Sequence, residues 1–111
     1  MKRVTDKDLQ AVVDRLNRMT NSPAAPYVKD ADGKYRAQVG NFHLSHAYGG
    51  VSIHRMVNES GGASDVLVSG HVSKRELHTA MFAFIQGLEF GAAANAALVT
   101  YYEDFDYGSN T

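Results

Sequence analysis

The sequence predicts an α+β fold in which a helix, an antiparallel β-meander of three or four strands and a second helix follow one another. The period of the apolar residues carries this prediction. It is the 3.6-residue period of a helix in residues 5–20 and again in residues 73–88, and it changes to the two-residue period of strands between them. Both helices are expected to pack on the apolar face of the sheet.

The length and composition are those of one globular domain. The chain has 111 residues, of which 44% are hydrophobic and 21% charged. We expect a single α+β domain over residues 1–97 and an acidic, aromatic C-terminal tail over residues 98–111. No apolar run reaches the roughly 18–20 residues of a membrane span. Cysteine is absent, which excludes disulfides, and we expect a cytoplasmic protein that binds no membrane.

The first helix has clear boundaries. Thr5 can cap it, and Asp6 and Asp8 lie in the first turn, where the helix dipole favours negative charge. One face is apolar, at Leu9, Val12, Val13, Leu16 and Met19. Asn21-Ser22-Pro23 ends the helix. Residues 23–33 are rich in proline, alanine, aspartate and glycine and are expected to form a loop.

The segments that follow alternate like strands, at Tyr35–Val39, Phe42–Tyr48, Val51–Val57 and, more briefly, Asp65–Ser69. Gly40-Asn41 and Gly49-Gly50 are suited to two-residue hairpin turns. The resulting register places Tyr48 opposite Val51 and gives one apolar face, which also holds His46 and Arg55. The other face is polar. The alternative is that Gly40-Asn41 forms a bulge in one longer strand.

The second helix begins with a capping box made by Ser73 and Glu76. Its apolar stripe contains Leu77, Ala80, Met81, Phe84, Ile85 and Leu88. Phe82 and Phe90 lie outside this stripe, and Gly87 and Gly91 allow a close neighbour. We therefore expect a homodimer with Phe82 and Phe90 at its interface. The alternative is that the C-terminal tail of the same chain covers both rings.

The residue patterns do not indicate catalysis. The sequence has no nucleophile elbow and no glycine loop that would cradle phosphates. Five histidines are present, at positions 43, 46, 54, 71 and 78. His43 and His54 could meet on the polar face, but no cysteine or carboxylate is placed to complete a tetrahedral metal site. We therefore expect no enzyme, no cofactor and no metal, and solvated surface histidines.

Three groups of residues are candidates for binding. Lys74, Arg75 and His78 could accept an anion at the start of the second helix, although a solvated helix end is the simpler interpretation. On the apolar face, Arg55, near His46, must reach the sheet margin, a carboxylate or a ligand. The tail could dock a partner or mimic nucleic acid, or its aromatic residues could pack on the body; its candidates are Tyr101, Tyr102, Glu103, Asp104, Phe105 and Asp106.

Two segments are similar to small bacteriophage and prophage proteins, over about residues 5 to 90. They are residues 41–56, with the sequence NFHLSHAYGGVSIHRM, and residues 70–77, with the sequence GHVSKREL. The resemblance implies a viral accessory protein in the cytoplasm of a bacterial host. Small phage proteins of this kind often act against host machinery. We therefore expect binding to a host or phage macromolecule, as an inhibitor of host defence or as a regulator.

The element order also resembles the double-stranded RNA-binding domain. That family begins its second helix with a basic motif whose side chains straddle phosphates. This motif is similar to Ser73-Lys74-Arg75-Glu76-Leu77-His78. The family's Gly-Pro-x-His loop is not evident, and the net charge here is −1. This resemblance implies nucleic-acid binding as the alternative function.

Overall fold

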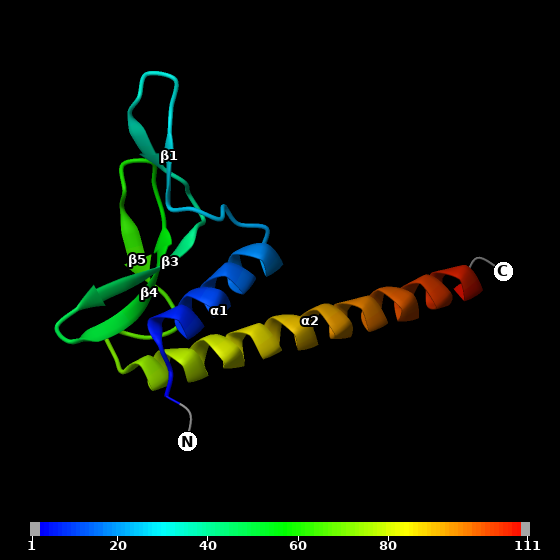
Figure 1. Cartoon of the computed structure of the whole chain (residues 1–111). Coiled ribbons are helices and arrows are strands. Elements are labelled where there is room, and N and C mark those ends of the chain that lie inside the picture. The colour runs from blue at the N-terminus through cyan, green and yellow to red at the C-terminus, as the bar shows by residue number, and fades with distance from the viewer. Residues whose placement is uncertain (1–2, 110–111) are drawn as a thin grey trace.

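The computed structural model describes the backbone of residues 3–109 and the side chains of residues 3–93. Its elements, in chain order, are α1 (Asp6–Met19), β1 (Tyr27–Lys29), β2 (Tyr35–Ala37), β3 (Phe42–Ala47), β4 (Gly50–Met56), β5 (Ala63–Asp65) and α2 (Lys74–Ser109) (Figure 1). The strands β3, β4 and β5 form an antiparallel sheet in that order, and β1 and β2 form a separate hairpin. The predicted α+β class and the helix–strands–helix order are confirmed.

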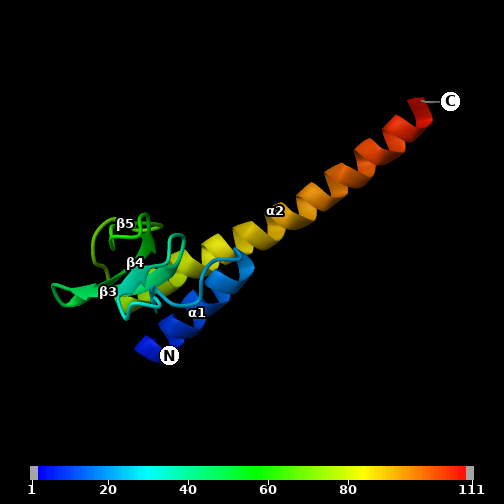
Figure 2. The same cartoon turned by 90° about the horizontal axis from the view of Figure 1, so that it is seen from above.

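The core lies between one face of the sheet and the two helices, which lie side by side against it (Figure 2). Its buried residues are Leu9, Val12, Val13 and Leu16 of α1, Phe42, Val51 and Ile53 of the sheet, and Leu77, Met81 and Ile85 of α2. Thr5 and Asp8 form a capping box at the start of α1. Met19 is exposed at the other end of that helix. The predicted apolar faces of both helices therefore meet in one core.

The turn between β3 and β4 lies one residue earlier than predicted. Tyr48 and Gly49 occupy it with φ values of 54° and 73°, the positive values that a type I′ turn requires. His46 therefore faces Val51, a register two residues from the predicted one. A shift of two residues keeps the side chains within β3 and β4 on their expected faces, but Tyr48, expected on the apolar face, lies in the turn and is 98% exposed. Glycine at position 50 serves close packing and not the turn, because a Cβ there would lie 3.0 Å from the Val72 carbonyl oxygen.

The prediction that the strand at Tyr35 pairs with the strand at Phe42 is wrong. Residues 27–29, expected in a loop, form β1 and pair with β2. The Asp30 carboxylate closes this hairpin by accepting hydrogen bonds from the amides of Asp32 and Lys34, both at 2.9 Å. The short strand after the Gly61-Gly62 loop also differs, because β5 spans Ala63–Asp65. Leu67, with φ of 67°, interrupts the extended backbone expected to continue to Ser69.

α2 projects beyond the rest of the fold (Figure 1). Ile85 is its last buried residue among the described side chains, and the helix continues to Ser109. Residues 98–109 are therefore helical and continuous with α2. Within the described part of the chain, neither helix combines the length and the apolar character that crossing a membrane requires.

Candidate functional site

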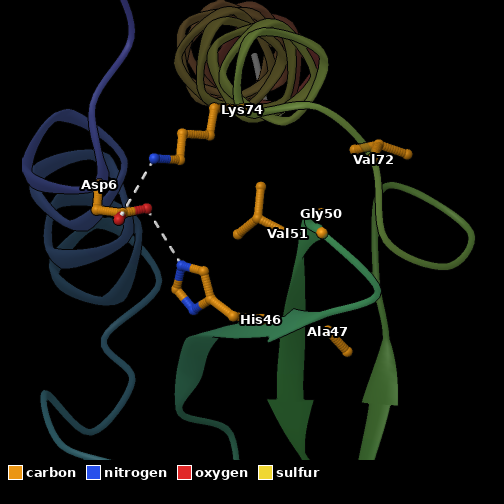
Figure 3. A pocket seen from close by; sticks show the side chains of 8 residues that line it. Asp6, His46, Ala47, Gly50, Val51, Val72 and Lys74 are labelled. Carbon is orange, nitrogen blue, oxygen red and sulfur yellow. Dashed lines mark hydrogen bonds and ion pairs between the residues drawn. The ribbon is translucent and has the colours of Figure 1, made fainter.

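The basic residues predicted at the start of α2 have different neighbours: Lys74 contacts Asp6, whereas Arg75 and His78 line a separate cavity. Ser73 caps the helix by accepting a hydrogen bond from the amide of Glu76 at 3.1 Å. The Lys74 ammonium group then lies 3.4 Å from one oxygen of Asp6, in the first turn of α1. The other oxygen of Asp6 lies 3.2 Å from Nε2 of His46 (Figure 3). Asp6 therefore joins the two helices and β3, and it supplies Lys74 with a counter-charge.

This contact forms one wall of a cavity of about 380 Å³, whose other lining residues include Ala47, Gly50, Val51 and Val72. The pKa of the Asp6 carboxyl lies below its usual value of 3.8, chiefly because of the hydrogen bond from His46. Desolvation opposes this shift, and the positive charge of Lys74 adds to it. Asp6 is therefore ionised at neutral pH. An anionic ligand of Lys74 would have to displace this carboxylate.

Arg75 and His78 lie in a different cavity, of about 340 Å³, which Arg3, Val4 and Asp8 also line. The His78 ring is tilted against the ring of Phe82, with 4.7 Å between their centroids. The structure thus brings Arg75 and His78 together and directs Lys74 elsewhere. The sequence could not indicate this division, because it depends on where α1 crosses the start of α2.

Arg55 reaches the margin of the sheet. It is exposed, its Nε donates to the Gly40 carbonyl oxygen at 3.4 Å, and its guanidinium carbon lies 5.2 Å from the centroid of the Phe42 ring. A cation over an aromatic face is a favourable contact. Arg55 pairs with Phe42 at one end of β3 and His46 pairs with Val51 near the other. The two residues therefore do not share one site.

A row of histidines crosses the polar face of the sheet. His43 lies directly opposite His54, with 5.9 Å between ring centroids, and the His71 ring lies 6.2 Å from that of His54. Nε2 of His54 lies 2.7 Å from an oxygen of Asp65, and Nε2 of His71 lies 3.1 Å from the Ser45 hydroxyl oxygen. These three half-buried histidines differ from the solvated ones that we expected.

Strand alternation alone predicts that His43 and His54 lie on one face. The contact between His54 and Asp65 could not be predicted, because it requires the observed position of β5. Among the described residues, no three histidine or carboxylate side chains are arranged to hold a metal ion.

Acid should destabilise this face. Burial, assisted by the charge of nearby His54, lowers the pKa of His43 below 6.5. Neutral His43 therefore contributes stability that is complete above pH 6.5 and is lost as the pH falls toward the lowered pKa. We expect the Tm to fall between about pH 7.5 and 5.5, and the His43→Gln variant to show a smaller fall. Asp6 contributes to this dependence only near and below pH 4. An equal dependence of Tm on pH in the natural protein and in His43→Gln would contradict the role assigned to His43.

The two aromatic residues proposed for the dimer interface lie at exposed positions of α2, Phe82 before Ile85 and Phe90 after it. Phe82 is 38% exposed and Phe90 is 77% exposed. A Cβ added at Gly87 or Gly91 would meet no atom of the described side chains, or of the backbone outside the same turns of α2, within 4 Å. The candidate tail residues Tyr101, Tyr102, Glu103, Asp104, Phe105 and Asp106 belong to the helical segment, and their side chains lie outside the described part of the structure.

Comparison with models of protein families, with curated proteins and with solved structures finds no match to this chain.

Proposed function

We propose that the chain is a non-enzymatic accessory protein of bacteriophage type that binds a host or phage protein in the cytoplasm of a bacterial host. It would act there as an inhibitor of host defence or as a regulator. The observation that carries this proposal is the projection of α2 beyond the core. A helix that continues from Ile85 to Ser109 with Phe90 77% exposed presents apolar surface that the described fold does not use.

The proposal assigns different tasks to the two parts of this projection. The proximal part, which contains Gly87, Phe90 and Gly91, would pair with a second copy of the chain, together with Phe82 just before the projection. Each glycine in a helix interior costs about 1 kcal/mol relative to alanine, and nothing in the described chain packs against these two. Close approach of a helix from a second copy would account for both glycines.

The distal part would bind the partner protein. Residues 101–107 combine four aromatic residues with three acidic ones and contain no basic residue. Aromatic residues provide much of the binding free energy at protein interfaces, because each buries a large area with few rotatable bonds. Three carboxylates would favour a basic patch on the partner and would repel nucleic acid.

Nucleic-acid binding of the double-stranded RNA-binding type is the second candidate. It is favoured by Arg3, Arg75 and His78, which surround one cavity at the start of α2. Against it, Lys74 already contacts the carboxylate of Asp6. Phosphate contacts would require a gain that exceeds the loss of that ion pair. We therefore rank this function below protein binding.

Affinity capture from infected bacteria distinguishes the two functions. With the full chain as bait, we expect one host or phage protein that survives nuclease treatment and is lost when residues 101–111 are removed. The double variant Lys74→Ala, Arg75→Ala is the control, and it should still capture the partner. Capture that nuclease abolishes, or that depends on Lys74 and Arg75 and not on the tail, would instead support the nucleic-acid function.

A further inference from the structure

The outer edge of β3 carries backbone groups that point away from the sheet. Val51 exchanges backbone hydrogen bonds with Val72 at 2.8 and 2.9 Å, and the carbonyl of Ile53 accepts from the amide of Val66. Val51 and Ile53 therefore direct their backbone groups away from β3. Their partners in β3 are His46 and Leu44, and in an antiparallel pair the two residues of such a position both point outward. Phe42 lies two residues before Leu44, so its backbone groups also point outward.

Asn17 of α1 occupies the outward position at Phe42. Its side-chain amide donates to the Phe42 carbonyl oxygen at 3.0 Å, and its side-chain oxygen accepts from the Phe42 amide at 2.9 Å. These are the two bonds that a residue of a neighbouring strand would make. At the next two outward positions, Leu44 and His46, the backbone groups have no hydrogen-bond partner within the described residues. They lie about 7 Å apart along the strand.

A groove of about 640 Å³ lies over these two positions. Phe42, Leu44 and His46 line it from the apolar face of β3, and His43 lines it from the polar face, so the groove covers the edge itself. Its remaining lining residues are Asp6, Lys7 and Gln10 of α1 and Ala24 and Pro26 of the loop that follows.

The lining of the groove holds one aspartate and one lysine, and of these two charges the lysine is the one available to an occupant. Asp6 is already bonded to His46 and Lys74. Lys7 makes no ion pair with any described residue and is exposed. The carboxylate of an incoming peptide could therefore pair with the ammonium group of Lys7. The ion pair would add selectivity, because most of the affinity in strand addition comes from the backbone.

We propose that the outer edge of β3 binds an extended acidic segment of a partner protein. The segment adds a fourth strand to the sheet, exchanges hydrogen bonds with the backbone of Leu44 and His46, and directs a carboxylate toward Lys7. The length of the free edge limits the pairing to these two positions, because Asn17 closes the edge at Phe42. This surface is separate from α2, so its failure would leave the function proposed for α2 unchanged.

A generic β-forming peptide tests this proposal, because strand addition depends mainly on the backbone. The probe is the blocked hexapeptide Thr-Val-Glu-Val-Thr-Val, added at millimolar concentration to the full-length protein. By NMR we expect the largest amide shifts, and slower amide hydrogen exchange, at Leu44 and His46. The same peptide N-methylated at alternate residues should bind at least tenfold more weakly. Equal binding of both peptides, or no shift at these two amides, would overturn the proposal.

Substitution of His46 separates the backbone from the side chain. His46→Pro removes an outward amide and leaves the hydrogen bonds between β3 and β4 in place, since proline is tolerated where an edge amide faces solvent. His46→Ala removes the contact with Asp6 and keeps the amide. We expect at least a tenfold loss of peptide affinity for His46→Pro and little change for His46→Ala. If His46→Pro does not fold, the N-methylated peptide still decides the question on the unaltered protein.

Lys7 is tested by charge reversal. Lys7→Glu should weaken binding of the glutamate peptide several-fold and strengthen binding of the matching lysine peptide, Thr-Val-Lys-Val-Thr-Val. If Lys7→Glu does not reverse the preference between the glutamate peptide and the lysine peptide, the proposal of an acidic occupant is overturned. Concentration-dependent shifts at Leu44 and His46 without any peptide would identify a second copy of the chain as the occupant, and would equally overturn the proposal.

Discussion

Replacing Asn17 with leucine is expected to lower the free energy of unfolding by about 3 kcal/mol or more. Asn17 is buried, and its side chain satisfies both the amide and the carbonyl of Phe42. Leucine has a similar volume but no polar atoms, so both backbone groups would lose their partners. Each buried unsatisfied group costs roughly 1–3 kcal/mol. Urea denaturation should show the loss as a lower midpoint with an unchanged slope.

Asn17→Asp is the matched control. Its carboxylate can accept from the Phe42 amide but places negative charge against the Phe42 carbonyl oxygen. A protonated carboxyl group could donate to that oxygen and restore both bonds. The deficit of Asn17→Asp relative to the natural sequence should therefore be larger at pH 7 than at pH 4. A loss below 0.5 kcal/mol for Asn17→Leu at neutral pH would contradict the role assigned to this side chain; that is the range of ordinary surface substitutions.

The elements that local patterns determine could be predicted from the sequence. α1 and the start of α2 follow from their capping residues and apolar stripes, and both are confirmed. The faces of β3 and β4 were also predicted correctly despite the wrong turn, because an error of two residues preserves the alternation. Asn17 was missed, although it lies four residues after Val13 and therefore falls on the apolar face of α1.

The remaining features depend on contacts between distant residues. β1 is stabilised by the turn that Asp30 forms, and the three residues Tyr27–Lys29 are too few to show a strand period within a segment that has the composition of a loop. Asp6 suits the start of a helix dipole whether or not it contacts Lys74, so no local pattern reveals that pair. The row at His43, His54 and His71 likewise requires β3, β4 and the loop before α2 to be placed together.

Replacing both Gly87 and Gly91 with alanine is expected to stabilise the isolated chain and to weaken the proposed homodimer. Alanine is favoured over glycine in a helix by about 1 kcal/mol per residue, so the free energy of unfolding should rise by about 2 kcal/mol. Among the described residues, no neighbouring atom would oppose the new methyl groups. In the dimer, however, these groups would separate two helices that pack closely at the glycines. The dimer dissociation constant should rise at least tenfold.

Gly49→Ala is the control for this last prediction. A Cβ at Gly49 also meets no described atom within 4 Å, but φ there is 73°, so alanine is strained and should lower stability by about 1 kcal/mol. Light scattering over a range of concentrations measures the association. We expect twice the 12.1 kDa mass of one chain for the natural sequence and for Gly49→Ala. A mass of 12.1 kDa at high concentration for the natural sequence would exclude the dimer. Equal association of the Gly87, Gly91 variant would move the interface to another face of α2, because two added methyl groups cannot be accommodated where helices pack on glycine.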